Sequence, residues 1–223
     1  VCDDTPCGYR CVVAAVPTCR DVWSREATEI NIKEKRPTLP KQLKARWSNV
    51  IGQNVNLLGE GVLGDGEADA RYRHYLEALT EPDINYISIK ISGIYAKLYP
   101  LSYEKSKTEL GERIARIFQQ GIDHPYTDKD GKEQPKFVNL DMEEYKDTEL
   151  TLDLFKTVMS RPEFKHYTAG IVVQAYLPDA QFFYEELLAF AKARVADGGA
   201  PIKIRLVKGA NLQMETIASS LKG

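Results

Sequence analysis

The sequence predicts an α/β fold, built as part of a TIM-like (β/α)8 barrel with about five βα units. Three observations lead to this prediction. Five short segments alternate apolar and polar residues, as half-buried strands do. Amphipathic stretches of helical length separate these segments, which is typical of a parallel sheet with right-handed crossovers. One face of every segment is polar, whereas a doubly wound sheet is apolar on both faces because helices cover both.

Each predicted strand carries polar side chains at every second position, so these side chains share one face. The five segments are Asn54–Glu60, Tyr86–Gly93, Lys136–Glu143, Gly170–Tyr176 and Ile202–Gly209. Their polar faces carry Asn56, Glu60, Ser88, Lys90, Asn139, Asp141, Gln174, Tyr176, Lys203 and Arg205. Acids, bases and amides that point into one space indicate an active site rather than a plain core.

The predicted helices follow from apolar residues at helical spacing. They cover Pro40–Trp47, Glu67–Thr80, Ser102–Gln120, Thr148–Met159, Gln181–Val195 and Leu212–Leu221. The apolar stripe of the second helix is predicted at Ala70, Tyr72, Tyr75 and Leu79, and that of the third at Leu110, Ile114, Ile117 and Phe118. The insert His124–Pro135 is polar and rich in turn residues, which predicts an exposed loop.

The length of the chain limits how much of a barrel it can form. A (β/α)8 barrel needs eight strands and roughly 250 residues, and these 223 residues give signals for five strands. We therefore expect residues 41–223 to be the N-terminal part of a barrel, completed by a missing C-terminal segment or by a partner chain in an oligomer. Residues 1–40 are predicted to be a poorly defined leader and linker.

The composition excludes some function classes. A net charge of −2 without a basic stripe predicts no nucleic-acid partner. No apolar run approaches the ~20 residues that span a bilayer. We expect a cytoplasmic location and leave open a peripheral contact with the inner membrane. The four cysteines (Cys2, Cys7, Cys11 and Cys19) lack the spacing of a zinc site, so no metal is predicted.

Three strand residues could carry chemistry. Lys90 lies between two isoleucines, so its ammonium must be paired or face a wet cavity. It could hold an anionic ligand or act as a Schiff-base amine, or it could form a structural ion pair with Asp141 or Glu143. Arg205 could hold a carboxylate or donate to a flavin nitrogen, and an ion pair is again the alternative. Gln174 suits an amide-like ring edge, although a satisfied core glutamine is equally compatible with the sequence.

The strand-end motifs together resemble the proline dehydrogenase family, including the proline dehydrogenase module of bifunctional PutA proteins. Six motifs occur in the family's order and cover the chain from Asn54 to its end. They are Asn56–Glu60 (NLLGE), Ile87–Ser92 (ISIKIS), Asn139–Glu144 (NLDMEE), Leu150–Phe155 (LTLDLF), Val173–Tyr176 (VQAY) and Ile204–Ala210 (IRLVKGA).

The resemblance implies a distorted barrel that binds FAD, oxidises L-proline to Δ1-pyrroline-5-carboxylate and passes electrons to a membrane quinone. It implies that Lys90, Asp141 and Arg205 are the catalytic residues, with Lys90 and Asp141 in the proline pocket. It also implies that FAD contacts Gln174, Arg205, Val207 and Gly209, with Arg205 near the reactive N5 edge. By the same resemblance Glu60 is the acid of a substrate gate.

The chain departs from the family pattern in two places. The last three strands and the final helix of the family, with the arginine pair that holds the proline carboxylate, have no counterpart in this sequence. Many relatives place a tyrosine against the flavin where this chain has Asn211. We therefore expect that the isolated chain does not turn over. Two other functions stay open: a Schiff-base lyase or aldolase that uses Lys90, and a non-catalytic half-barrel that needs a partner chain.

Overall fold

The computed structural model describes residues 43, 53–56, 62–98, 103–209 and 211–222. The chain divides into two compact units, Val1–Ile51 and Gly52–Gly223, and the elements below belong to the second. Apart from Leu43, which is helical, the predicted helix Pro40–Trp47 lies outside the described residues. The same is true of the C-terminal part of the predicted strand Asn54–Glu60, including Glu60.

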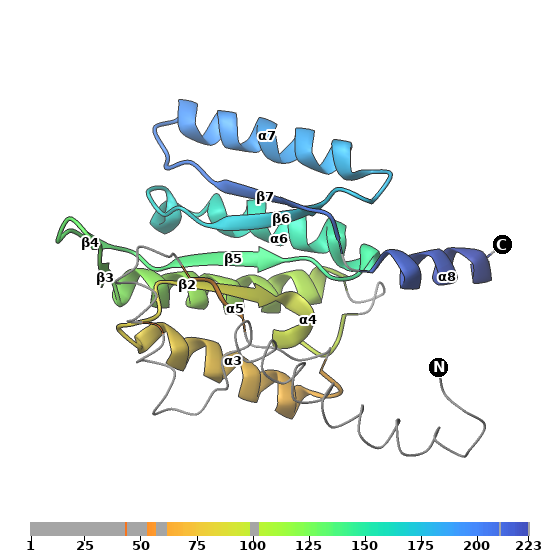
Figure 1. The fold of residues 1–223 in the computed structure, drawn as a ribbon, viewed down its shortest axis with the longest axis horizontal. Helices are drawn as coiled ribbons and strands as arrows, with labels where there is room; N and C mark the ends of the chain where they lie inside the picture. The colour runs from red at the N-terminus through yellow and green to blue at the C-terminus, as the bar shows by residue number, and fades with distance from the viewer. Residues whose placement is uncertain (1–42, 44–52, 57–61, 99–102, 210, 223) are drawn as a thin grey trace, which may run out of the picture. The chain divides into compact units, whose positions relative to one another are not determined.

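Five parallel strands form one sheet in the order β1-β2-β5-β6-β7 (Figure 1). The strands are β1 (Val55–Asn56), β2 (Tyr86–Lys90), β5 (Phe137–Asp141), β6 (Gly170–Gln174) and β7 (Lys203–Val207). Their order follows the chain without a reversal. When every new strand joins the same edge, right-handed crossovers place all the connecting helices on the same face. This order is that of a barrel wall, because a doubly wound sheet reverses direction.

Four of the described helices pack in sequence beside one another. The helices of this unit are α3 (Asp65–Thr80), α4 (Ile91–Ile94), α5 (Tyr103–Asp123), α6 (Thr148–Met159), α7 (Ala180–Ala196) and α8 (Leu212–Lys222). Helix α3 packs against α5, α5 against α6, and α6 against α7. The predicted partial (β/α)8 barrel is confirmed as a five-stranded segment, and the described residues form no closed barrel.

The strand register separates an apolar face from a polar one. The residues that face the helices are buried: Ile87, Ile89, Val138, Leu140, Ile171 and Val173. On the other face, Asn56 lies beside Ser88, Ser88 beside Asn139, and Asn139 beside Gly170. One step further along the strands, Lys90 lies beside Asp141 and Val172 beside Arg205. The polar face that the alternation predicts is therefore one continuous surface.

Glycine is required at one point of this polar face. A Cβ atom on Gly170 would lie 2.5 Å from Asn139 Oδ1 and 2.8 Å from the Phe137 ring. Neither neighbour could move away freely, since both belong to the adjacent strand. Gly170 therefore gives Asn139 the room to lie flat on the polar face.

The structure corrects some local predictions. The insert His124–Pro135 is not simply a loop, because β3 (Tyr126–Thr127) and β4 (Glu133–Gln134) form an antiparallel hairpin there. The predicted second strand ends at Lys90, where α4 begins. In α3 the predicted stripe is partly wrong: Tyr75 and Leu79 are buried, but Ala70 is exposed and Ala68 is buried instead. The α5 stripe is confirmed.

Candidate active site

A cavity of about 370 Å³ opens at the carboxyl ends of the parallel strands. Strands β2, β5 and β6 end at Lys90, Asp141 and Gln174, so each strand delivers a polar side chain to this end of the sheet. Active sites of (β/α) barrels lie at this end. The cavity is lined by Asn56, Lys90, Asp141, Met142, Glu143, Val172, Gln174, Arg205, Val207, Gly209 and Asn211.

Two ion pairs hold the charged groups of the cavity. Lys90 Nζ pairs with a carboxylate oxygen of Glu143, and Ser92 Oγ donates to the other oxygen at 3.4 Å. Arg205 pairs with Asp141 Oδ1 at 2.5 Å, and Asn139 Nδ2 donates to the same oxygen at 2.6 Å. The four charges cancel, so the cavity can accept an uncharged or zwitterionic ligand without a net charge penalty.

Asp141 is the most enclosed of the four charged groups, with its side chain 11% exposed. Burial raises the pKa of Asp141 above its ordinary value, although Arg205 and Lys90 each act to lower it. Desolvation disfavours the carboxylate form, and the two cations favour it. Loss of either neighbouring cation would therefore favour the protonated form of Asp141.

Gln174 is buried and presents one end of its amide to the cavity. Its Nε2 donates to the carbonyl oxygen of Glu143 at 3.2 Å, while Oε1 is buried and has no hydrogen-bond partner among the described residues. Other buried atoms in the same situation are Asn56 Oδ1, Asn139 Oδ1, Tyr176 Oη and Arg205 Nε. Buried polar groups are normally satisfied, so this group of atoms indicates that a ligand or ordered water completes the site.

Gly209 closes the carboxyl end of β7 with a left-handed backbone, at a φ of +96°. A Cβ atom at this position would lie 1.8 Å from Cδ1 of Tyr176. The ring of Tyr176 thus lies directly against the glycine backbone. Both the backbone conformation and the close ring require glycine here.

The structure brings together all the predicted site residues that it describes. Lys90, Asp141, Gln174, Arg205, Val207 and Gly209 line the same cavity. Glu60 lies outside the described residues. The roles assigned to these residues stay predictions, because the cavity shows proximity and not function.

Glu143 and Asn211 also line the cavity but were not among the predicted site residues. Asn211 Nδ2 donates to the carbonyl oxygen of Glu143 at 2.7 Å. A signal for Asn211 was present in the sequence, since it directly follows the strand-end motif that ends at Ala210. Glu143 also had a signal, since it ends the predicted strand Lys136–Glu143 on the face of Asn139 and Asp141, although β5 itself ends at Asp141.

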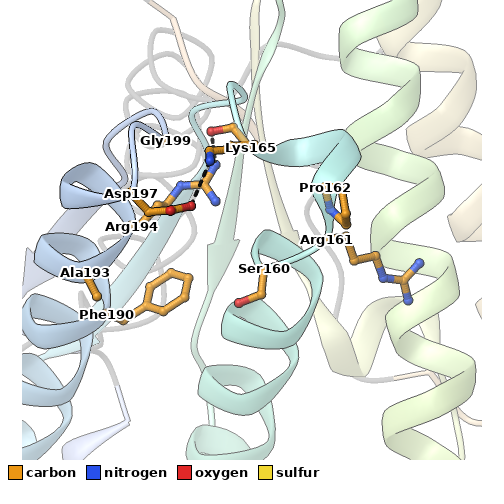
Figure 2. A pocket seen from close by; sticks show the side chains of 9 residues that line it. All are labelled: Ser160, Arg161, Pro162, Lys165, Phe190, Ala193, Arg194, Asp197 and Gly199. Carbon is orange, nitrogen blue, oxygen red and sulfur yellow. Dashed lines mark hydrogen bonds and ion pairs between the residues drawn. The ribbon is translucent and has the colours of Figure 1, made fainter.

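A second cavity, of about 560 Å³, lies between α6 and α7 (Figure 2). Its residues belong to segments that precede β6 and β7, so it lies at the amino ends of the strands. Arg161 pairs with Glu112 and Lys165 with Asp197. Arg194 donates to five backbone carbonyl groups, those of Met159, Phe164, Lys165, Tyr167 and Ala200. Because these cations are already paired, this cavity is not a good anion site.

No group of three or more His, Cys, Asp or Glu side chains in the described part of the chain is arranged to hold a metal ion. Among the described helices, none combines the length and the apolar character needed to cross a membrane.

A parallel βα sheet wound in one direction, with a charged cavity at its strand carboxyl ends, defines a domain of the (β/α)-barrel enzyme class. The sequence profile of proline dehydrogenase matches residues 39–223. The chain belongs to the proline dehydrogenase family.

Solved structures of proline utilization A (PutA) resemble the fold. The Corynebacterium freiburgense protein is 43% identical with a TM-score of 0.75, over 82% of this chain and 18% of that one. The Bdellovibrio bacteriovorus protein, inactivated by N-propargylglycine, is 31% identical with a TM-score of 0.70, over 81% of this chain and 20% of that one. The bifunctional PutA of Klebsiella aerogenes is 26% identical over an alignment of 187 residues, and the match covers 76% of this chain and 13% of that protein. The chain thus spans a fifth or less of the length of these relatives.

Proposed function

We propose that the chain carries part of an FAD-dependent proline dehydrogenase, which oxidises L-proline to Δ1-pyrroline-5-carboxylate in proline catabolism. The observation that carries the proposal is the cavity at the strand carboxyl ends, where Lys90, Asp141 and Arg205 meet. The chain belongs to the family with this activity. The inactivator of the Bdellovibrio protein, N-propargylglycine, is a secondary amino acid like proline, which supports the substrate class.

The residues of the cavity fit a flavin. An isoalloxazine edge offers both hydrogen-bond donors and acceptors, and the cavity offers Gln174 Oε1 as an acceptor and Arg205 Nε as a donor. Both atoms are buried without a hydrogen-bond partner among the described residues. Val207 and Gly209 would form the wall beside the ring. Bound FAD would supply the hydride acceptor that no side chain provides.

The protein groups would bind and orient proline rather than attack it. Proline is a zwitterion, which suits a cavity whose four charges cancel. Its ammonium can bind a carboxylate of one ion pair, and its carboxylate can bind a cation of the other. Asp141 and Lys90 lie side by side on adjacent strands, so they can hold opposite ends of such a ligand. Orientation and electrostatics of this kind are the main contribution of a protein to hydride transfer.

Other parts of the proposal rest on the family resemblance alone. We infer that Glu60 serves as the gate acid, that a membrane quinone accepts the electrons, and that further βα units complete the barrel. These units would come from a C-terminal segment or from a partner chain. Residues 1–40 would be a leader and linker outside the barrel.

The test is a visible absorption spectrum of the purified chain with FAD, followed by anaerobic proline. If the protein perturbs the flavin spectrum and the bound flavin bleaches when proline is added, the activity is established and the chain suffices for turnover. Bound flavin without bleaching would support a cavity that holds the cofactor but does not suffice for turnover, which is the result we expect. Failure to bind flavin would overturn the proposal for this chain. Arg205→Met is the matched variant, and we expect it to weaken flavin binding at least tenfold, equivalent to about 1.4 kcal/mol.

A further inference from the structure

Glu143 contacts three sides of the cavity from a position just beyond β5. Its carboxylate bonds to the end of β2 and the following helix, and its backbone carbonyl accepts hydrogen bonds from β6 and from the segment after β7. The side chain is 35% exposed, so it is neither a core residue nor a free surface group.

The carboxylate determines where the Lys90 ammonium lies. A second carboxylate beside Lys90 belongs to Asp141, its register partner on the adjacent strand. The Oδ1 atom of Asp141 already accepts from Arg205 and from Asn139. Lys90 bonds to Glu143 instead, and Ser92 Oγ donates to the second oxygen of this carboxylate. This arrangement holds the lysine side chain, which is 22% exposed, at the edge of the cavity.

The backbone carbonyl of Glu143 determines which end of Gln174 faces the cavity. Gln174 Nε2 donates to this carbonyl at 3.2 Å, and Asn211 Nδ2 donates to it at 2.7 Å. A carbonyl can accept from an amide nitrogen but not from an amide oxygen. The Gln174 amide is thus fixed with Oε1 on the other side, where this atom is buried without a partner among the described residues.

We propose that Glu143 is a positioning residue: its carboxylate holds Lys90 in place for the substrate, and its carbonyl orients Gln174 for the flavin. Asn211 supports the second role. The ligands named here, proline and the flavin, rest on the proposed function. The contacts of Glu143 can be tested whether or not that function is correct. A group that orients another ligand-binding side chain commonly changes affinity by tenfold or more when it is removed.

The first test measures how firmly the Lys90 amine is held in its ion pair, by competitive acylation of the lysine amines followed by mass spectrometry. The variant is Glu143→Gln, and the matched control is Glu144→Gln, because Glu144 is exposed and pairs with Lys146 instead. Acylation requires the amine to leave its ion pair. We expect about fivefold faster labelling of Lys90 in E143Q relative to the other lysines, no change in E144Q, and recovery in E143D. Equal labelling in the wild type and E143Q would overturn the proposal, even if the chain bound no flavin.

The second test uses the FAD-loaded protein and separates effects on proline binding from effects on flavin binding. In E143Q we expect proline to bind about tenfold more weakly, while the flavin spectrum and affinity stay unchanged. In Asn211→Ala we expect the converse, a changed flavin spectrum with little change in proline binding. If the loss of proline affinity in the double variant K90M/E143Q equals the sum of the losses in the two single variants, Glu143 does not act through Lys90. If the wild type binds no flavin, the proposed function fails, and the labelling experiment still decides the role of the Glu143 carboxylate.

Discussion

Lys136 is a cation inside the layer between the sheet and its helices. It precedes β5 on the helix-facing side, its side chain is 1% exposed, and Nζ donates to the carbonyl oxygen of Glu81 at 2.5 Å. Burial lowers the pKa of Lys136 to about 8, although Glu81 and Asp83 act to raise it. Below pH 8 the folded and unfolded chains both carry this proton, so the full cost of burying the charge is present.

We predict that Lys136 makes the chain more stable as pH rises above 8. Between pH 8 and about 10.4 the unfolded chain binds the proton and the folded chain does not, so the free energy of unfolding increases with pH. We compare the free energy of unfolding of the wild type and Lys136→Met in urea. Across this pH range the wild type should gain about 2 kcal/mol relative to the variant. Lys132→Met, in an exposed hairpin residue, is the control. A difference that does not depend on pH would contradict the prediction.

At the scale of single residues, strand alternation predicted the direction of side chains well and their partners poorly. It placed Lys90, Asp141 and Arg205 on one face because the period of a strand is fixed. It left open whether Lys90 pairs with Asp141 or with Glu143. The structure pairs Lys90 with Glu143, whereas Asp141 Oδ1 accepts from Arg205, 64 residues further along the chain, and from Asn139 on its own strand.

Arg194 connects three elements through its guanidinium group. From the last turn of α7 it donates to the end of α6, to the segment around η3 (Pro162–Phe164) and to the loop before β7. Figure 2 shows Arg194 beside Lys165 and Gly199 at this junction. A Cβ atom on Gly199 would lie 2.9 Å from Arg194 Cγ, so the glycine makes room for the arginine stem.

We predict that Arg194→Met lowers the free energy of unfolding by about 3 kcal/mol, because it leaves several backbone carbonyls without their donor. Lys192→Met on the same helix is the control, since Lys192 is exposed. Chemical denaturation of the three proteins measures both effects. If both variants unfold at the same denaturant concentration as the wild type, the five hydrogen bonds of Arg194 do not stabilise the fold.

The sequence predicts long elements better than short ones. Helix α6 has the predicted bounds, Thr148–Met159, because it carries a complete amphipathic pattern. The β3–β4 hairpin was missed because each of its strands has two residues, too few for alternation to be visible. Helix α4 was missed because its sequence continues the apolar run of β2, and four residues show no helical period.

For the molecule as a whole, the parallel order of the strands and an open sheet edge were predictable from the five strand signals, but the particular side chains exposed there were not. Among the described residues, β7 pairs only with β6, so one of its edges is unpaired. Leu206 on this strand is 65% exposed. Helix α8 adds further exposed apolar side chains: Leu212, Met214, Ile217 and Leu221. An unpaired strand edge beside apolar surface is a site for pairing with another chain.

We therefore predict that the isolated chain self-associates through β7 and α8. Light scattering coupled to size-exclusion chromatography should show oligomers, and the double variant Leu206→Lys/Ile217→Lys should shift the chain toward monomer, because charge on an edge opposes strand pairing. Val195→Lys is the control, since Val195 is an exposed apolar residue that belongs to α7 rather than to β7 or α8. A monodisperse wild-type monomer would contradict the prediction. It would also argue against the proposal that further βα units, from a longer chain or from a partner, cover this edge in the complete protein.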